Sequence, residues 1–323
     1  MLLEVKDLNI SLASGKCVAE HISFQLDQGE MLSIVGSSGA GKTTICKAIM
    51  GLLGNTYRAD GEILFQGEDL LDLPERKRQT IYGKEICLIM QNPMTAFNPS
   101  IRVGRQMEKT YLLHHGKTPR QEMQRLFAAI LQKLGLEDTQ RILNSYPFTL
   151  SGGMLQRLMI ACAIYVAPSL ILADEPTTAL DVTVQAEILD LLRLARDEFD
   201  ASVLIITHNM GVIADIADQV VVMYRGHVVE QGDVEQIFYH PKDDYTKRLL
   251  GAVPRIGQKL VVRDREGKPI ERKADWREQP IAVEAKNLTI TYPGHLMQPD
   301  FKAVDGANFT IHRSEVLGLV GES

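Results

Sequence analysis

The sequence predicts an α/β fold built on a mostly parallel core sheet, and three observations indicate it. First, short and almost continuous apolar runs recur along the chain, as strands covered on both faces require; they span residues 31–35, 86–90, 170–174, 202–207 and 219–224. Second, helical patterns lie between these runs. Third, a glycine-rich turn joins the first run to a helical pattern, forming a strand–turn–helix unit.

Length and composition indicate a globular protein and exclude several classes. The chain has 323 residues, of which 45% are hydrophobic and 24% charged, with a formal net charge of -6. A net negative charge gives no indication of a basic surface that would bind nucleic acid. The four cysteines lack a C-x-x-C pair, so a disulfide framework or thiolate metal site has no support and a reducing cytosol fits best. The most apolar run, residues 158–173, is short for a membrane span of about 20 residues.

The turn after the first apolar run reads GSSGAGKT and matches G-x-x-x-x-G-K-[ST]. Its glycines let backbone N–H groups face phosphate oxygens, and the following helix N-terminus adds partial positive charge. We expect Lys42 to span the β- and γ-phosphates, Thr43 to bind Mg²⁺ and Thr44 to lie near the α-phosphate. The alternative is an ordinary glycine-rich turn. The predicted phosphate-binding residues are Gly36, Ser37, Ser38, Gly39, Ala40, Gly41, Lys42, Thr43 and Thr44.

A long helical insertion separates the second apolar run from the third. Within residues 120–136 the apolar side chains fall at i, i+3, i+4, i+7, i+8 and i+11, which predicts one apolar stripe; they are Met123, Leu126, Phe127, Ile130, Leu131 and Leu134. The insertion is followed by TLSGGMLQR, where Ser151 and two glycines precede a helical pattern. This is a second place where backbone donors and a helix start can bind an anion.

The third apolar run ends in LILADEP, which places two adjacent carboxylates after a buried strand. Asp174 is expected to hold Mg²⁺ through water, and Glu175 is a candidate base for an attacking water. A solvated turn at a strand end is the alternative. A phosphate loop and this acidic pair together favour nucleoside triphosphate hydrolysis.

These motifs together resemble the ATP-binding subunits of ABC transporters over residues 1–253, because MQNP at 90–93, TALD at 178–181 and THN at 207–209 stand in the family's order. The resemblance implies an α/β P-loop NTPase fold of the ABC ATPase type. It has a mostly parallel core sheet, an antiparallel β subdomain, a helical subdomain at about 98–165 and a C-terminal extension at about 236–253. ATP and Mg²⁺ are the implied cofactors.

The resemblance also implies roles within one subunit. Gln91 matches the glutamine that senses Mg²⁺ and water and links the nucleotide to the membrane partner, so it is predicted as both a catalytic and a metal residue. His208 matches the histidine that contacts the γ-phosphate, although a lone histidine at a strand end is usually structural. With Glu175 these residues form the predicted catalytic set, and with Thr43 and Asp174 the predicted metal set.

Other residues match motifs that act across a dimer interface. Ser151, Gly153 and Gln156 lie in the signature that caps the γ-phosphate of ATP held by the opposite subunit, and Asp181 ends the loop that crosses the interface. The chain departs from the family at Leu12, where an aromatic residue commonly stacks on adenine. Stacking on a base is worth about 1–3 kcal/mol, so its loss is expected to weaken adenine affinity or selectivity.

Two segments favour one branch of the family. MQNPMTAFNPSIRVG and the tail around His240, Pro241, Tyr245 and Thr246 resemble peptide and nickel importers, and SGGMLQR leans toward the nickel type. The implied function is ATP hydrolysis that drives uptake of nickel or of di- or oligopeptides. The implied partners are permease subunits in the membrane and a second ATPase subunit or domain, with a solute-binding protein acting indirectly. The implied location of the protein is the cytoplasmic face of a bacterial-type membrane.

The beginning of the sequence is repeated near its end. A charged stretch at 254–280 reads as a linker, after which AVEAKNLTITY echoes LLEVKDLNISL and VLGLVGES echoes MLSIVGSS. Residues 281–323 therefore look like the truncated start of a second ATPase domain in a fused two-ATPase protein. This copy stops before a phosphate loop. Two alternatives for the whole chain are a non-transport ABC ATPase and an inactive fragment that only binds nucleotide.

Overall fold

The computed structural model describes residues 1–136, 138–178, 180–253, 276–293 and 300–321. The chain divides into two compact units, residues 1–253 and residues 254–323. Most of the predicted linker at 254–280 lies outside the described residues, as do the last two residues of the repeated phrase at 316–323. Among the described helices, none is long and apolar enough to cross a membrane.

The larger unit is built on a six-stranded sheet with the strand order β10-β9-β3-β8-β7-β6. Its strands are β3 (Met31–Gly36), β6 (Ile86–Ile89), β7 (Leu170–Asp174), β8 (Ser202–Thr207), β9 (Gln219–Tyr224) and β10 (His227–Asp233). Neighbours pair in parallel except β10, which is antiparallel to β9. The five apolar runs are five of these strands, and the mostly parallel core sheet is confirmed.

The central strands are mostly apolar because both faces of the sheet are covered. In β8, Val203 and Ile205 belong to a core shared with the helical side, whereas Leu204 and Ile206 belong to a second core shared with the antiparallel strands. All four side chains are fully buried. Side chains alternate between the two faces of a strand, so in a strand between two cores both sets of side chains are mainly apolar.

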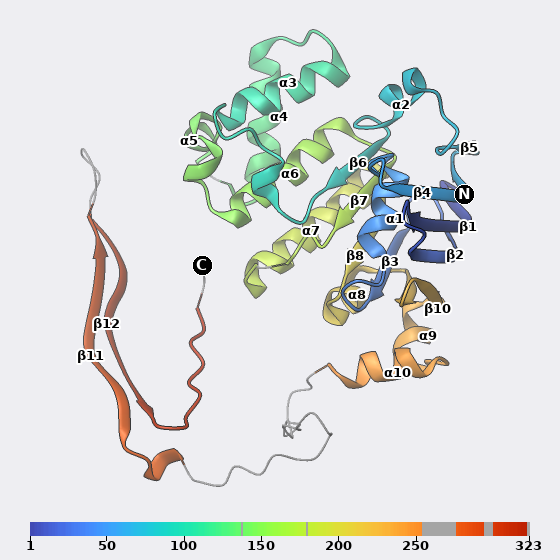
Figure 1. The fold of residues 1–323 in the computed structure, drawn as a ribbon. Helices are drawn as coiled ribbons and strands as arrows, with labels where there is room; N and C mark the ends of the chain where they lie inside the picture. The colour runs from blue at the N-terminus through green and yellow to red at the C-terminus, as the bar shows by residue number, and fades with distance from the viewer. Residues whose placement is uncertain (137, 179, 254–275, 294–299, 322–323) are drawn as a thin grey trace. The chain divides into compact units, whose positions relative to one another are not determined.

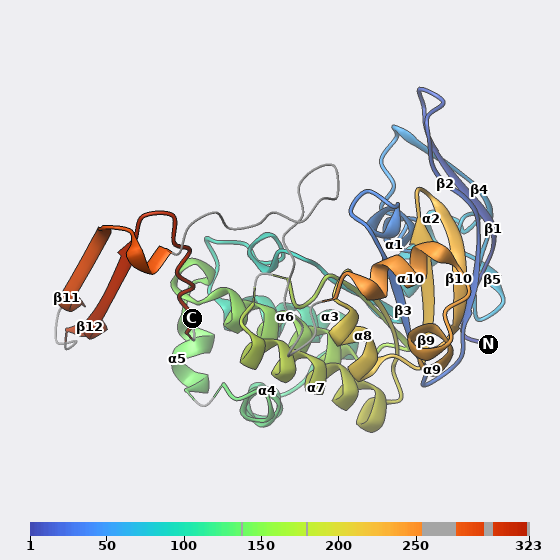
Figure 2. The same cartoon turned by 90° about the horizontal axis from the view of Figure 1, so that it is seen from below.

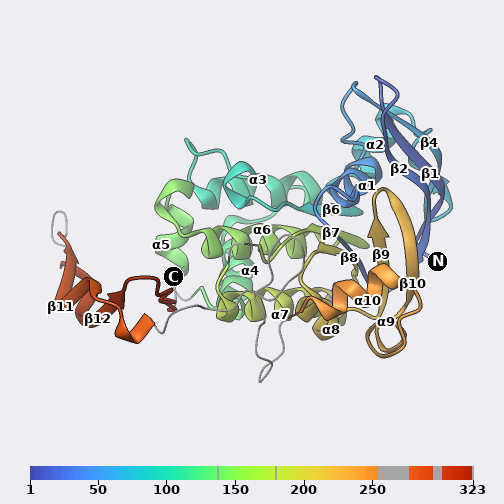
Figure 3. The ribbon, with the colours of Figure 1, turned by 60° about the horizontal axis from the view of Figure 1, so that its bottom comes forward.

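Helices surround the sheet and gather into a separate lobe at one side of it (Figures 1 and 3). The lobe holds α3 (Val103–His115), α4 (Arg120–Lys133), α5 (Thr139–Asn144) and α6 (Gly152–Val166). The remaining helices of this unit, apart from the C-terminal two, are α1 (Lys42–Ile49), α2 (Glu75–Ile81), α7 (Val182–Phe199) and α8 (Met210–Ile216), and short 3-10 turns occupy Pro93–Thr95 and Pro147–Thr149. The predicted helical insertion is confirmed.

A second, antiparallel sheet covers the other side of the core (Figure 1). It has the order β2-β1-β4-β5, with β1 (Leu3–Leu12), β2 (Cys17–Leu26), β4 (Tyr57–Phe65) and β5 (Glu68–Asp69). Its inner side chains pack with α1 in one hydrophobic core. The antiparallel β subdomain is therefore confirmed.

The apolar stripe of α4 is narrower than the periodicity predicted. Met123, Phe127, Ile130 and Leu131 are buried against α3 and α6, but Leu126 is 36% exposed. A helix that contacts its lobe along one edge buries the i and i+4 positions and leaves the flank of the stripe in solvent.

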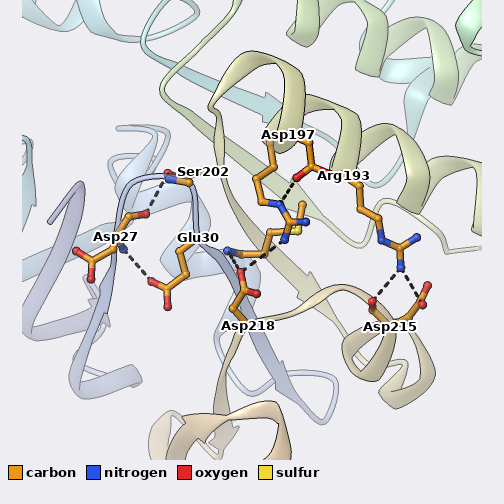
Figure 4. Close-up of polar contacts among 10 residues, drawn as sticks. Asp27, Glu30, Arg193, Asp197, Ser202, Asp215 and Asp218 are labelled. Atoms are coloured by element: carbon orange, nitrogen blue, oxygen red, sulfur yellow. Dashed lines mark hydrogen bonds and ion pairs between the residues drawn. The ribbon is translucent and has the colours of Figure 1, made fainter.

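Polar contacts close the end of the core sheet where its parallel strands begin (Figure 4). The Asp218 carboxylate accepts a hydrogen bond from the backbone N–H of Met31 at 2.8 Å and pairs with Arg196 at 3.8 Å. The Ser202 hydroxyl donates to the carbonyl of Asp27 at 3.0 Å. These contacts satisfy backbone groups that would otherwise be unpaired at the strand starts, and they leave the opposite, carboxyl ends for the functional site.

The C-terminal extension of this unit consists of α9 (Val234–Tyr239) and α10 (Asp244–Gly251), and α10 lies along β10 (Figure 2). Glu230 of β10, only 8% exposed, anchors it. The carboxylate accepts hydrogen bonds from the backbone N–H groups of Lys242 at 2.8 Å and Asp243 at 3.0 Å, and from Nε2 of Gln236 at 2.9 Å. Burial alone would raise the pKa of Glu230, but these donors outweigh it and lower the pKa.

Glu230 is therefore expected to make folding stability depend on pH. Its folded-state pKa lies below the ordinary value of 4.5, so its contribution is fully present above that value and is lost as pH falls through the folded pKa. We expect Glu230→Gln to cost about 1.5–3 kcal/mol at neutral pH and to flatten the acid limb of the stability curve. Urea unfolding of the wild type and of Glu230→Gln, from neutral pH down through the acidic range, measures the free energy of unfolding of each. Parallel curves would contradict the role of the charge.

The smaller unit contains a 3-10 turn at Trp276–Glu278 and a hairpin of β11 (Ile281–Tyr292) and β12 (Phe301–His312). Its register reproduces that of β1 and β2 pair by pair. In the first hairpin Leu3, Val5, Leu8 and Ile10 stand opposite Leu26, Phe24, Ile22 and Ala19. In the second hairpin Val283, Ala285, Leu288 and Ile290 stand opposite Ile311, Phe309, Ala307 and Val304. These are the positions that the repeated sequence aligns.

The β-bulge of the first hairpin also recurs in the second. Asp7 and Asn287 both have left-handed backbone, with φ of 46° and 50°. The N–H of Asp7 donates to the Ser23 hydroxyl at 3.0 Å, and the N–H of Asn287 donates to the Asn308 side-chain oxygen at 2.8 Å. A bulge that recurs with the same side-chain-to-backbone bond is a specific structural feature, so the two hairpins share a local design.

Candidate functional site

The phosphate loop runs from the end of β3 into α1 and is closed on itself by Lys42. The Lys42 ammonium donates to the carbonyls of Gly36 at 2.8 Å and Ser37 at 3.0 Å, and the residue is only 6% exposed. Burial lowers the pKa of Lys42, while Glu175 and Asp174 act in the opposite direction. The loop therefore holds its cation in place beside two carboxylates.

Two glycines of the loop have no room for a side chain. A Cβ on Gly36 would stand 2.1 Å from the carbonyl oxygen of Met223, which is backbone and cannot rotate away. Gly41, at the start of α1, has φ of 96° and would place a Cβ 3.0 Å from the carbonyl oxygen of Val18. Glycine is thus required where the loop leaves β3 and where it enters the helix.

Asp174, the last residue of β7, meets the start of α1 across the sheet edge. Its Oδ1 accepts a hydrogen bond from the Thr43 hydroxyl at 3.0 Å. Burial raises the pKa of Asp174, and the Thr43 bond acts against this rise. A hydroxyl beside a carboxylate suits Mg²⁺, which typically takes one or two protein oxygens and completes its shell with phosphate and water. Among the described residues no group of three or more acidic, His or Cys side chains is placed to hold a metal ion, so this donor pair fits Mg²⁺ only together with a phosphate substrate.

Glu175 follows directly and is held by three side chains. Thr178 Oγ1 donates to it at 2.9 Å, Gln91 Nε2 donates at 3.0 Å, and His208 Nδ1 lies 3.1 Å from its other oxygen. Its backbone has φ of 48°, a left-handed conformation that costs energy for a non-glycine residue. Burial would raise the pKa of Glu175, but the bonds from Thr178 and His208 prevail and lower it. The group is an ionised acceptor at neutral pH.

Several of these residues line one cavity of about 580 Å³ at the carboxyl ends of the parallel strands. This is the edge at which open α/β sheets bind ligands, and the volume suits a nucleotide-sized molecule. The lining comprises Val18, Ser38, Gly39, Ala40, Gly41, Lys42, Thr43, Thr44, Gln91, Glu175 and His208. All but Val18 are residues that the sequence motifs predicted.

The signature segment is not part of this cavity lining. Ser151 is exposed and caps α6, since its hydroxyl oxygen accepts from the N–H of Met154 at 3.3 Å. Its hydroxyl proton remains able to donate outward. A Cβ on Gly153 would stand 3.1 Å from Val184, so this glycine lets α6 approach the start of α7. Ser151 thus presents donors on the surface, as a site for another molecule's anion requires.

The other predicted residues of this segment are placed differently. Gln156 is 2% exposed, and its Nε2 is buried without a hydrogen-bond partner among the described residues. A side chain so enclosed cannot touch a neighbouring molecule in this conformation, so the role predicted for Gln156 gains no support. Asp181 caps α7 through the N–H of Val184 at 2.9 Å, and Val182 beside it is 82% exposed.

Two features of the site escaped the sequence patterns. Val18 of β2 supplies apolar surface beside the loop, whereas Leu12 stands opposite Tyr57 in the antiparallel sheet and is not among the lining residues. The Tyr245 hydroxyl accepts a hydrogen bond from the N–H of Ser37 at 2.9 Å. The sequence places Tyr245 in a family-specific tail, and nothing in its own neighbourhood along the chain indicates a contact with the loop.

Fold and cavity together define a nucleotide-binding protein of the P-loop class, and comparison with known proteins places it more closely. Residues 19–178 match the family model described as ABC transporter. The chain is 45% identical over 260 residues to the oligopeptide transport ATP-binding protein OppD of Bacillus subtilis, covering 79% of this chain and 72% of that protein. The chain belongs to the ATP-binding proteins of ABC transporters, within the group that includes peptide importers.

Two further comparisons concern the extent of the likeness. The chain is 39% identical along its whole length to the peptidoglycan transport ATP-binding protein YejF of Agrobacterium fabrum, and spans 58% of that protein. Among solved structures, the dimeric ATP-binding cassette MJ0796 bound to ADP and Pi is similar with a TM-score of 0.64 and 26% identity. That match covers 72% of this chain and 99% of the cassette.

Proposed function

We propose that this chain hydrolyses ATP to drive an importer for peptide-class solutes. One observation carries the proposal: residues 38–44 of the phosphate loop line a single cavity together with Gln91, Glu175 and His208, and the Thr43 hydroxyl in that lining is bonded to Asp174. A structural glycine turn would not need an ionised carboxylate held by three donors. The likeness to an ADP-bound cassette supports ATP as the nucleotide.

The chemistry follows from what each residue can do. Lys42 and the loop N–H groups bind and orient the phosphates, and Thr43 with Asp174 would hold a Mg²⁺ that neutralises charge on the triphosphate. Glu175 accepts a proton from the attacking water, and Gln91 orients that water. His208 already contacts Glu175, so it can hold the carboxylate and approach the γ-phosphate when the site fills.

Peptides are the cargo that the relatives favour over nickel. The two relatives compared above are named for the transport of oligopeptide and of peptidoglycan. Only the segment SGGMLQR favours the nickel type, and neither relative compared above is named for nickel. We therefore propose di- or oligopeptides, or solutes that carry a peptide.

The partners follow from the exposed signature. Ser151 and Gly153 lie outside the cavity that holds Lys42, so we propose a head-to-tail dimer in which each signature meets the other subunit's ATP. The dimeric cassette among the similar structures supports this arrangement. Membrane permease subunits on the cytoplasmic side, served by a solute-binding protein, would complete the importer.

We further propose that residues 281–323 belong to a second ATPase domain, joined through the linker at 254–280. The matching register and the matching bulge of the two hairpins support this reading. So does YejF, which aligns with the whole chain and is longer. Leu8, on the inner face of the first hairpin, is buried. The corresponding residue of the second hairpin, Leu288, is exposed in the described part of the chain.

ATP hydrolysis measured against protein concentration tests the function. If the chain assembles with itself, activity per molecule with Mg·ATP should rise with concentration and saturate, because the catalytic site is completed by a second copy. Activity that is constant over the range would contradict the shared site. No activity at any concentration, with ATP still bound, would support a chain that needs a different partner subunit.

A further inference from the structure

The C-terminal extension touches the phosphate loop through one hydroxyl. The N–H of Ser37 donates to the Tyr245 hydroxyl at 2.9 Å, and the two residues are 208 positions apart in the sequence. The carbonyl of the same Ser37 accepts from Lys42 at 3.0 Å and from the N–H of Ala40 at 3.2 Å. Both backbone groups of Ser37 are thus fixed, one by the loop itself and the other by α10.

The Tyr245 ring is held firmly enough to support the loop. It stacks on Tyr224 with ring centroids 4.2 Å apart, and the Arg225 guanidinium lies 5.1 Å from the Tyr224 ring centre. Tyr224 ends β9 directly after Met223, the residue whose carbonyl excludes a side chain on Gly36. The Tyr245 ring is therefore held by β9, the strand whose end also packs against the phosphate loop.

The helix that carries Tyr245 is itself anchored. Asp243 caps α10 by accepting from the N–H of Tyr245 at 2.7 Å, and the buried Glu230 accepts from the N–H groups of Lys242 and Asp243. Thr246, the next residue, is fully buried. These contacts fix the backbone on both sides of Tyr245, so its hydroxyl has a defined position relative to Ser37.

We propose that Tyr245 is a positioning residue for nucleotide binding, which holds the phosphate loop in its binding shape from the C-terminal extension. The proposal rests on the proposed ATP site. A loop held in its bound shape before the ligand arrives loses less entropy on binding. The coupling must be reciprocal: if α10 favours the binding shape of the loop, bound nucleotide favours the docked position of α10.

Tyr245→Phe tests this because it removes the hydroxyl and keeps the ring. We expect ATP to bind about two- to tenfold more weakly, the range that loss of one ordinary hydrogen bond allows. The KM for ATP should rise while kcat at saturating ATP stays near the wild-type value, since the lost contact is the same in ground and transition states. Titration with trinitrophenyl-ATP and steady-state hydrolysis measure the two quantities.

Hydrogen–deuterium exchange on the full chain gives a readout without activity. In the nucleotide-free protein, Tyr245→Phe should speed exchange in the segment 34–40. In the wild type, ATP should slow exchange in α10, and this protection should shrink in the variant. Tyr239→Phe is the matched control, because it makes the same change in the same extension at a side chain that is 76% exposed. It should leave both segments and ATP affinity unchanged.

The outcomes of these experiments distinguish a failure of the role proposed for Tyr245 from a failure of the proposed ATP-binding function. Unchanged ATP affinity and unchanged loop exchange in Tyr245→Phe would overturn the role of the hydroxyl. A fall in kcat together with a lower unfolding temperature would also overturn it, because Tyr245 would then serve the fold in general. If the wild-type chain itself binds no ATP, the proposed function fails instead.

Discussion

Glu175→Gln is expected to lower kcat for ATP hydrolysis by about 10²–10⁴-fold, the range that a positioned general base contributes. The carboxylate is an ionised acceptor, because Thr178 and His208 hold its pKa below the ordinary value. Glutamine keeps the size and one acceptor oxygen but cannot take a proton from water. ATP binding should persist, since Glu175 does not belong to the phosphate loop. Steady-state hydrolysis and trinitrophenyl-ATP titration measure the two effects separately.

The same variant should accumulate an ATP-bound dimer if the chain pairs with itself. Bound ATP bridges the loop of one copy and the signature of the other, and without hydrolysis the bridge persists. Gel filtration with Mg·ATP should then show the variant as a dimer. Glu122→Gln, a change of the same kind at an exposed position on α4, is the control and should behave as wild type. Near-normal kcat in Glu175→Gln would exclude this residue as the base.

Local patterns predicted the strands and the phosphate loop well, for physical reasons. A strand covered on both faces is apolar at nearly every position, so runs such as 202–207 can be recognised without any knowledge of their neighbours. The loop from Gly36 to Thr43 has all its determinants within eight consecutive residues, including the glycine that faces Met223. A local structure can be predicted from the sequence when all the residues that determine it lie in one short segment.

Features that depend on distant partners were not predictable in this way. The contact between Ser37 and Tyr245 depends on how α10 is anchored at Glu230, which no local pattern encodes. Gln156 lies in the signature, but its place on α6 turns its side chain into the core, whereas Ser151 at the helix start remains exposed. The flank of the α4 stripe at Leu126 stayed exposed because periodicity gives the direction of a face and not how much of it is covered.

Lys42→Ala is expected to weaken ATP binding at least about tenfold, because a charged donor to phosphate is worth about 1.5–3 kcal/mol. The ammonium is nearly buried and bridges two loop carbonyls, so its removal also loosens the loop. The fold itself should tolerate the change, since burial already disfavours the charged form of Lys42 and lowers its pKa. Loss of binding without loss of folding would be specific to the loop.

Thermal unfolding with and without Mg·ATP distinguishes these effects. A ligand that binds only the folded chain stabilises it by RT ln(1 + [L]/Kd), so Mg·ATP should raise the unfolding temperature of Lys42→Ala less than that of the wild type. Lys47→Ala is the matched control, because Lys47 lies on the same helix α1 and is exposed. It should shift as wild type does. If Lys42→Ala retains the full shift, the phosphates are bound elsewhere, and the roles of Thr43, Asp174 and Glu175 around this cavity would have to be abandoned.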